Sequence, residues 1–288
     1  MNGNRSTIAV VFDFDDTLVP DSTTQLLETA SPPINVKTFW KQDFKKLVQC
    51  GYDPTLAYLK LLLENVGIGK PLGPMSIAGL RRFGRSLDTK FYPGLPKLFD
   101  DLRRIVKRAK NIDIEFFIVS GGLQDVIEGS KTVKKYFKAV YGCCLSENSN
   151  GVLSEVKRSI TFTEKTRYLF EINKGLDPHR TRRNPYLVNE DVPSIKRPIP
   201  FENLIYVGDG LTDIPCFSLV QRSGGIAFGV FNPNEQKSAK RALLKFLKPR
   251  RVVSAHAPKY GPDDDLGSFL RAAVAERCTR LKVQQHQA

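Results

Sequence analysis

Two aspartates follow the first apolar run of the chain, residues 8–12: Asp13 directly and Asp15 two residues later. Side chains two apart in an extended chain project to the same side, so we expect the two carboxylates to converge. Adjacent carboxylates repel each other and need a cation, a shared proton or surrounding water. A divalent metal would leave one carboxylate free to attack a substrate and the other free to exchange a proton. A solvated acidic turn is the alternative interpretation.

The second long apolar run, residues 112–119, is followed by Ser120, Gly121 and Gly122. A hydroxyl and exposed backbone amides before a predicted helix could hold an oxyanion, although an ordinary helix cap has the same composition. Farther along the chain, Lys165 falls in the first turn of another predicted helix. A lysine there could neutralise both a phosphate and an attacking carboxylate, whereas most isolated lysines are simply solvated.

A third apolar run, residues 204–207, leads into Gly208-Asp209-Gly210 and then Asp213. The glycines let the backbone turn sharply and bring acidic groups inward. Asp209 and Asp213 are therefore candidates to complete an oxygen-rich magnesium site with the aspartates of the first run. Each of these elements could be structural by itself, but four of them in one order, each at a strand or helix end, rarely arise by chance.

The apolar runs alternate with segments of helical spacing, and a fourth run covers residues 226–231. This alternation predicts an α/β fold with a doubly wound, Rossmann-like parallel sheet as its core. Between the first two runs, the spacing predicts a series of helices separated by glycine and proline. We therefore expect a small all-helical cap domain at residues 21–90, inserted into a core formed by residues 1–20 and 91–288.

Three further predictions concern the second half of the chain. An Asn-Gly pair at residues 150–151 predicts a β-hairpin. Thr161 and Glu164 have the spacing of a capping box, which predicts a helix that begins near residue 162 and ends at Gly175. The segment 177–200 is rich in proline, arginine and asparagine, which predicts a long surface loop.

The composition indicates an ordinary globular protein. A chain of 288 residues with 41% hydrophobic content can hold an α/β core and an inserted domain. No apolar run approaches the roughly 20 residues of a membrane span, and the polar start lacks the build of a secretory signal, so we expect a cytoplasmic protein. Five cysteines without a Cys-x-x-Cys pair argue against a disulfide framework and a structural zinc site.

Taken in order, the motifs resemble those of the haloacid dehalogenase-like superfamily. The resemblance covers about residues 8–231, and the helical insertion is similar to the cap of the phosphoserine-phosphatase-like branch. The matching residues are Asp13-x-Asp15-x-Thr17, Ser120, Lys165 and Gly208-Asp209-Gly210-x-x-Asp213.

This resemblance implies a Mg²⁺-dependent phosphatase that hydrolyses a small phosphate monoester through an aspartyl-phosphate. It implies Asp13 as the nucleophile and Asp15 as the general acid/base. It implies that Ser120, Gly121 and Lys165 bind the phosphoryl group, and that Thr17 belongs to the same substrate-binding set and orients the loop. The implied metal ligands are Asp13, Asp15 (through its backbone carbonyl), Asp209 and Asp213.

The presence of Asp15 favours phosphate esters, since the dehalogenases and phosphonate-cleaving members of the superfamily lack this second aspartate. The phosphoserine phosphatases place a substrate-reading glutamate where this chain has Ser22, and a cap arginine near the position of Leu59. The leaving group is therefore expected to be something other than serine.

A net charge of +14 keeps a second class of function open, because a positive field attracts anionic partners. Basic clusters at residues 180–183 and 237–251, the second on a predicted helix over 236–247, would suit a nucleic-acid-binding or scaffold protein without turnover. A phosphatase of nucleotide or polynucleotide ends would use both features. No recognisable RNA- or DNA-reading motif supports the binding alternative.

Overall fold

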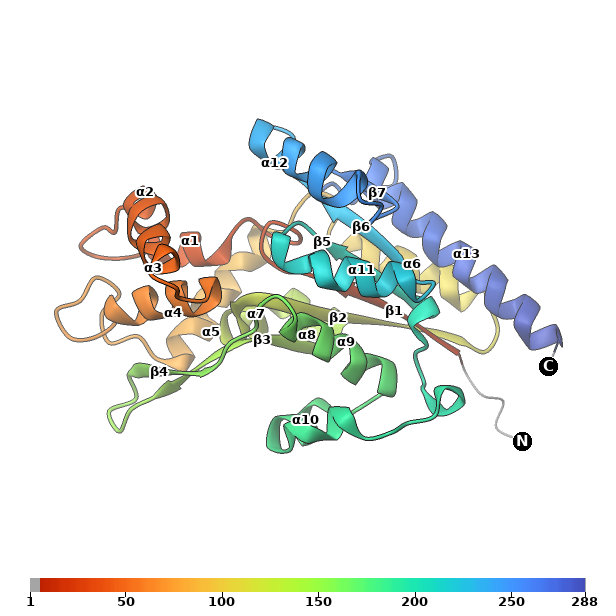
Figure 1. The fold of residues 1–288 in the computed structure, drawn as a ribbon, viewed down its shortest axis with the longest axis horizontal. Helices are drawn as coiled ribbons and strands as arrows, with labels where there is room; N and C mark the ends of the chain where they lie inside the picture. Colours follow the sequence, from red (N-terminus) through yellow and green to blue (C-terminus); the bar gives the residue numbers. More distant parts are fainter. Residues whose placement is uncertain (1–5, 288) are drawn as a thin grey trace.

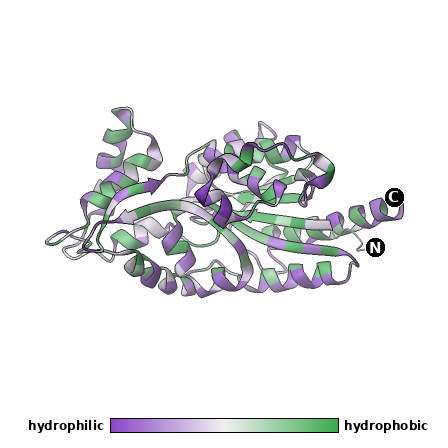
Figure 2. Ribbon diagram, turned by 90° about the horizontal axis from the view of Figure 1, so that it is seen from below, coloured by the Kyte–Doolittle hydropathy of each residue, from purple (hydrophilic) through white to green (hydrophobic). Residues whose placement is uncertain are grey.

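The computed structural model describes residues 6–287, which form one sheet with helices on both faces (Figures 1 and 2). In this part of the chain the strand order is β4-β3-β2-β1-β5-β6-β7, and every neighbouring pair is parallel except β3 with β4. The predicted doubly wound core is confirmed, with an antiparallel edge strand added. The strands are β1 (Ser6–Phe12), β2 (Ile112–Leu123), β3 (Phe137–Glu147), β4 (Leu153–Arg158), β5 (Leu204–Gly208), β6 (Ile226–Val230) and β7 (Ser254–His256).

The first strand lies in the middle of the sheet, because its wholly apolar residues 8–12 need no contact with water. Val11 pairs with β2 on one side and with β5 on the other, and Figure 2 shows the central strands as largely hydrophobic. All four predicted strands are present, and the predicted hairpin is the turn between β3 and β4. The first part of β3, which pairs with β2, was not predicted, because Lys138 and Gly142 interrupt its apolar residues.

Helices cover both faces of the sheet, as the alternation of strands and helices predicts (Figure 1). Helices α6 and α13 pack against each other; α6 contacts β2, and α13 contacts β1 and β7. Helices α9 and α11 form a second pair, which contacts β2, β5 and β6. The helices of the core are α6 (Lys97–Lys107), α7 (Gln124–Gly129), α8 (Lys131–Tyr136), α9 (Glu164–Lys174), α10 (Pro178–Arg183), α11 (Ile214–Arg222), α12 (Gln236–Arg241) and α13 (Asp265–Gln287).

The stretch between β1 and α6 is helical, which confirms an inserted helical region after the first strand (Figure 1). Its second helix is continuous over residues 36–49, although a π-helical turn, Phe39–Phe44, interrupts the α-helical hydrogen bonding. The division into two domains at residues 20 and 90 stays a prediction. The inserted helices are α1 (Ser22–Leu27), α2 (Val36–Thr38), α3 (Lys45–Gln49), α4 (Pro54–Glu64) and α5 (Ile77–Ser86).

Two predictions in the second half of the chain need correction. Helix α9 begins at Glu164, two residues after the predicted start, so its N-cap residue is Thr163 rather than Thr161 of the predicted capping box, and Thr163 makes no side-chain cap hydrogen bond. The helix does end at Gly175, which has a left-handed φ of 64° that suits glycine. The predicted loop 177–200 contains α10, because Asp177 caps this helix through the amides of its first turn.

None of the helices within residues 6–287 is both long and apolar enough to cross a membrane. All five cysteines are free thiols, as expected, and Cys50 is the exposed one among them. The polar start of the chain, on which the prediction of no secretory signal depends, lies largely outside the described residues.

Candidate active site

The carboxyl ends of β1, β2 and β5 meet in the middle of the sheet, and each carries residues of the predicted motifs. Asp13 follows β1, Ser120 lies near the end of β2, and Asp209 follows β5. The backbone of β1 and β5 stays paired up to the motif, because the Asp13 N–H donates to the Val207 carbonyl at 2.8 Å. Carboxylate oxygens of Asp13, Asp209 and Asp213 lie within 4.8 Å of one another. The acids from distant parts of the chain do meet, as expected.

Lys165 is fully buried between two of these acids. Its Nζ donates to Asp13 Oδ2 at 2.8 Å and to Asp213 Oδ1 at 2.7 Å. Burial by itself lowers the pKa of Lys165, but the two carboxylates outweigh burial and raise that pKa above its ordinary value. The lysine is therefore a permanent cation that links the β1 end to the β5 end.

Three groups of the site hold the Asp213 carboxylate. Besides Lys165, the Tyr206 hydroxyl donates to Oδ1 at 2.7 Å, and the Gly210 N–H donates to Oδ2 at 2.8 Å. Tyr206 is a site residue that the sequence did not reveal, because a tyrosine inside an apolar strand looks like ordinary core. Both oxygens of Asp213 accept hydrogen bonds, so this residue positions Lys165 in addition to being a possible metal ligand.

The carboxyl groups of the site are difficult to keep ionised without a further cation. The pKa of Asp13 is raised to about 6, chiefly by burial, with Lys165 partly offsetting the rise and Asp213 adding to it. Burial and the neighbouring Asp13 raise the pKa of Asp209, and burial together with Asp21 raises that of Asp15. Lys165 and a longer contact from Arg241 to Asp209 set two positive charges against four acids, of which Asp13 and Asp213 are buried and Asp15 and Asp209 half-buried. An all-oxygen donor set with excess negative charge fits a hard divalent cation, so Asp13, Asp209 and Asp213 could hold a metal.

Asp15 lies beside Ser120–Gly122, the irregular end of β2 where its pairing with β3 shifts register, called the glycine loop here. Its Oδ1 accepts from the Ser22 N–H at 2.7 Å, and this bond ties the acid to the first inserted helix. Gly122 faces its other oxygen so closely that an added Cβ would overlap Oδ2. A glycine at this position is therefore a steric requirement of the site.

The remaining predicted residues surround the same loop. Ser120 is buried, and its Oγ accepts from the Gly122 N–H at 3.0 Å, which leaves the hydroxyl proton free to donate. The Gly121 carbonyl accepts from the Tyr58 hydroxyl of α4 at 2.6 Å. Thr17 is fully buried and does not line the cavity described next, while its carbonyl accepts from Tyr260 at 2.6 Å. This placement suits a residue that orients the loop.

A cavity of about 430 Å³ opens between these strand ends and the inserted helices. Asp13, Asp15, Asp209 and the Ser120–Gly122 loop line its base. Its opposite wall comes from α1, the π-helical turn and α4. The arrangement can hold an anionic group together with a cation at the base and a leaving group against the helices.

Comparison with solved structures identifies the fold. The chain resembles a probable phosphoserine phosphatase from Vibrio cholerae, with a TM-score of 0.55, 13% identity and coverage of 96% of this chain and 67% of that one. The chain has the haloacid dehalogenase-like fold. It also resembles cytosolic 5′-nucleotidase IIIB in a structure bound to cytidine, with a TM-score of 0.52, 14% identity and coverage of 95% of this chain and 87% of that one. At these identities the likeness establishes the fold alone.

A sequence relative is known from Borreliella burgdorferi. It is 31% identical over 242 residues, which cover 76% of this chain and 80% of the relative. The two chains belong to one family within the haloacid dehalogenase-like fold, and that member is named only as an uncharacterized protein. No family model matches the chain.

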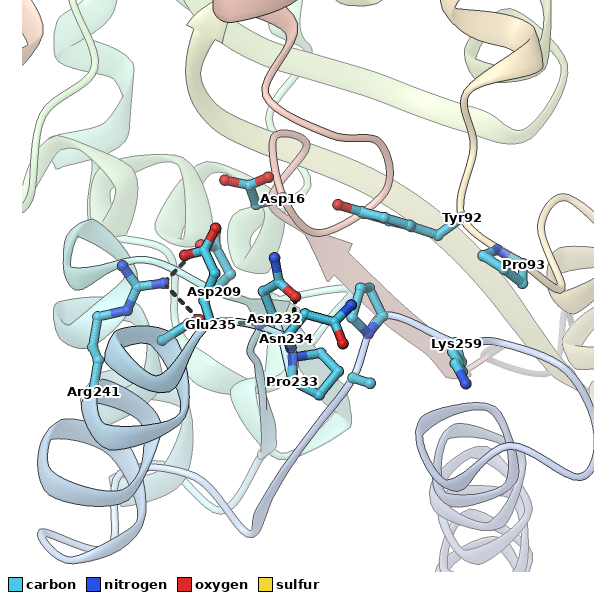
Figure 3. A pocket seen from close by; sticks show the side chains of 13 residues that line it. Asp16, Tyr92, Pro93, Asp209, Asn232, Pro233, Asn234, Glu235, Arg241 and Lys259 are labelled. Carbon is cyan, nitrogen blue, oxygen red and sulfur yellow. Dashed lines mark hydrogen bonds and ion pairs between the residues drawn. The ribbon is translucent and has the colours of Figure 1, made fainter. Parts of the chain in front are cut away.

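Arg241 is a second site residue that the sequence did not reveal, since it was predicted only as part of the basic cluster at residues 237–251. In this haloacid dehalogenase-like chain it reaches from α12 to Asp209, with 3.4 Å between Nη2 and Oδ2. Figure 3 shows the pair beside Asp16 and Tyr92, around a second cavity of about 380 Å³ that adjoins the first. A basic residue at that helical position gave no signal of its contact with a motif aspartate.

Proposed function

We propose that this chain is a magnesium-dependent phosphatase that hydrolyses a small phosphate monoester with Asp13 as its nucleophile. The observation that carries this proposal is the position of Asp13. It lines an open cavity, its Oδ2 is 2.8 Å from the buried Lys165 ammonium, and its carboxylate lies within metal-binding range of Asp209 and Asp213. An acid held in this way is both charged and accessible to a phosphoryl group.

Asp13 would attack phosphorus to form an aspartyl-phosphate. Phe14 N–H donates to its Oδ1 at 2.7 Å and Lys165 to its Oδ2, so the carboxylate is fixed before substrate arrives. The lysine reduces the repulsion between an anionic nucleophile and an anionic substrate. Magnesium would be held by Asp13, Asp209, Asp213 and the Asp15 carbonyl, where its charge would stabilise the phosphoryl group during transfer.

Asp15 would act as the general acid and then as the general base. Its raised pKa, caused by burial and by Asp21, favours the protonated form that can donate to the leaving oxygen. The resulting carboxylate would take a proton from the water that hydrolyses the aspartyl-phosphate. Ser120, Gly121 and Lys165 would bind the phosphoryl oxygens, while Thr17 would support the loop.

Phosphoserine remains a poor fit for the leaving group. Ser22 is buried and does not line the cavity, so its side chain cannot replace the glutamate that reads the substrate in the phosphoserine phosphatases. Leu59, near the expected cap arginine, is fully buried and apolar. A different phosphate monoester is therefore proposed as the substrate.

Removal of magnesium tests the cation requirement. Chelation with EDTA is expected to lower kcat/KM for p-nitrophenyl phosphate by at least about 10²-fold, because the charge on the transferring group loses its stabilisation. Added Mg²⁺ should restore the rate and raise the melting temperature of the chelated protein. Asp209→Asn should weaken both responses, whereas the exposed Asp263→Asn should not. Full activity in EDTA would refute the metal assignment.

Replacement of Gly122 by alanine tests the position of Asp15. The added Cβ would displace the Asp15 carboxylate, and misplacement of a reacting group by about 1 Å can lower kcat/KM by about 10²-fold. The matched variant Gly121→Ala should lose less activity, because its Cβ would meet the Ile160 carbonyl at an ordinary 3.7 Å. Steady-state kinetics with thermal melts of both variants separate this effect from misfolding; equal losses would count against it.

A further inference from the structure

Three aromatic side chains from the inserted helices line the same cavity as Asp13. Trp40 and Phe44 belong to the π-helical turn, and Tyr58 belongs to α4. Trp40 and Phe44 are only partly buried, so part of each ring is free to contact a ligand in the cavity. The proposed phosphatase mechanism does not use these rings.

The rings are held in a series that begins at the glycine loop. The Tyr58 hydroxyl donates to the Gly121 carbonyl at 2.6 Å, which places this ring beside the proposed phosphoryl site. Trp40 follows at 6.2 Å between ring centroids, and Phe44 lies 5.3 Å beyond Trp40. Trp40 cannot turn freely, because its Nε1–H donates to Thr24 Oγ1 at 2.9 Å. The series therefore forms a fixed wall that leads away from the site of chemistry.

The backbone that carries Trp40 and Phe44 is itself unusual. Both lie in the π-helical turn Phe39–Phe44, and such turns are rare and frequent at functional sites. Phe39 at the start of the turn is buried in the core, whereas Trp40 and Phe44 line the cavity. The turn thus divides its aromatic residues between packing and the cavity.

The charge of this wall limits the kind of leaving group. Apart from the three aromatics, the inserted helices and the caps in front of them contribute Asp21, Thr23, Pro54 and Thr55 to the described cavity lining, and none of these is a cation. A carboxylate on the leaving group would find no cationic partner on this wall and would be repelled by Asp21. The one cation in the described lining, Arg241, lies outside the inserted helices and contacts Asp209 at 3.4 Å. Sugar hydroxyls, in contrast, could donate to Asp21 and to the threonines.

We propose that the Trp40–Phe44–Tyr58 wall selects nucleoside monophosphates, with the base stacked on the aromatic rings. This inference rests on the proposed phosphatase function and names its substrate class. A nucleoside monophosphate combines a phosphoryl group, a hydroxylated sugar and a flat ring. The cavity offers a counterpart to each part: the acidic proposed metal site for the phosphoryl group, polar acceptors for the sugar and the aromatic wall for the base. Stacking tolerates any base because every base has a π-face.

The kinetic test compares substrates that differ only by the base. The kcat/KM for cytidine and guanosine 5′-monophosphate is expected to exceed that for ribose 5-phosphate by about 5-fold to 150-fold, the range that one stacked base supplies. Trp40→Leu should bring this ratio close to one, while Trp40→Phe should keep most of it. The control Tyr52→Leu, an exposed aromatic of the same insertion that does not line the cavity, should leave the ratio unchanged.

A binding test that needs no turnover can use tryptophan fluorescence. Trp40 is the only tryptophan of the chain, so the emission reports on this residue alone. In the Asp13→Asn protein, cytidine and guanosine monophosphate should cause a saturable loss of tryptophan emission that ribose 5-phosphate does not cause. Saturable quenching without hydrolysis by the wild-type protein would refute the phosphatase but support the base site. Hydrolysis of ribose 5-phosphate or phosphotyrosine as fast as the nucleotides, with no quenching, would overturn the base site and leave the phosphatase standing.

Discussion

Asp13→Asn is expected to lower kcat for a phosphate monoester by at least about 10⁴-fold, since removal of a covalent nucleophile leaves only binding and charge stabilisation. The amide oxygen can still accept the Phe14 N–H bond, and Lys165 keeps its bond to Asp213. The variant should therefore fold. Single-turnover assays should detect no phosphorylated protein, in contrast to the wild type.

The matched control for this substitution is Asp43→Asn. Asp43 is exposed on the inserted helices, and its change to asparagine removes the same charge from the chain. We expect wild-type activity from this control and similar far-ultraviolet circular dichroism from both variants. A well-folded Asp13→Asn protein that retains a tenth of the wild-type rate would exclude Asp13 as the nucleophile.

Lys165→Met is expected to lower the free energy of unfolding by roughly 3 to 5 kcal/mol in magnesium-free buffer, as found when one partner of a buried ion pair is removed. Asp13 and Asp213 would then remain buried without their common cation. Urea denaturation followed by circular dichroism gives the difference. Magnesium should reduce the deficit, because a bound cation can replace part of the lost charge.

The matched control is Lys138→Met, which removes a lysine from a surface pair with Glu115. Its effect should stay below about 1 kcal/mol, because water screens the exposed pair. The two variants should also differ in their pH dependence. Asp13 has a pKa of about 6 in the wild type, and loss of Lys165 raises it further, so the variant is protonated first and the Lys165→Met deficit should shrink as pH falls to about 6 and stay level below that. Equal effects of the two substitutions at neutral pH would contradict the structural role of Lys165.

The presence of the buried strands and the convergence of the acidic motifs at their ends could be predicted because both depend on local patterns. An apolar run without polar residues becomes a strand buried on both faces, and the carboxyl ends of neighbouring parallel strands meet at one edge of the sheet. Asp13 and Asp209 were therefore expected to meet, and their oxygens do. Where polar residues interrupt the run, as Lys138 does in β3, the same reasoning failed.

The amino-acid sequence by itself determined which residue types stand at the strand ends, and hence the acidic chemistry of the site. Only the tertiary structure decided which partners those residues have: Tyr206 on Asp213, Arg241 on Asp209 and the aromatic wall opposite Asp13. These contacts join elements far apart in the chain, or depend on which face of its helix a side chain occupies. They depend on how whole layers pack, which the spacing of residues along one element does not specify.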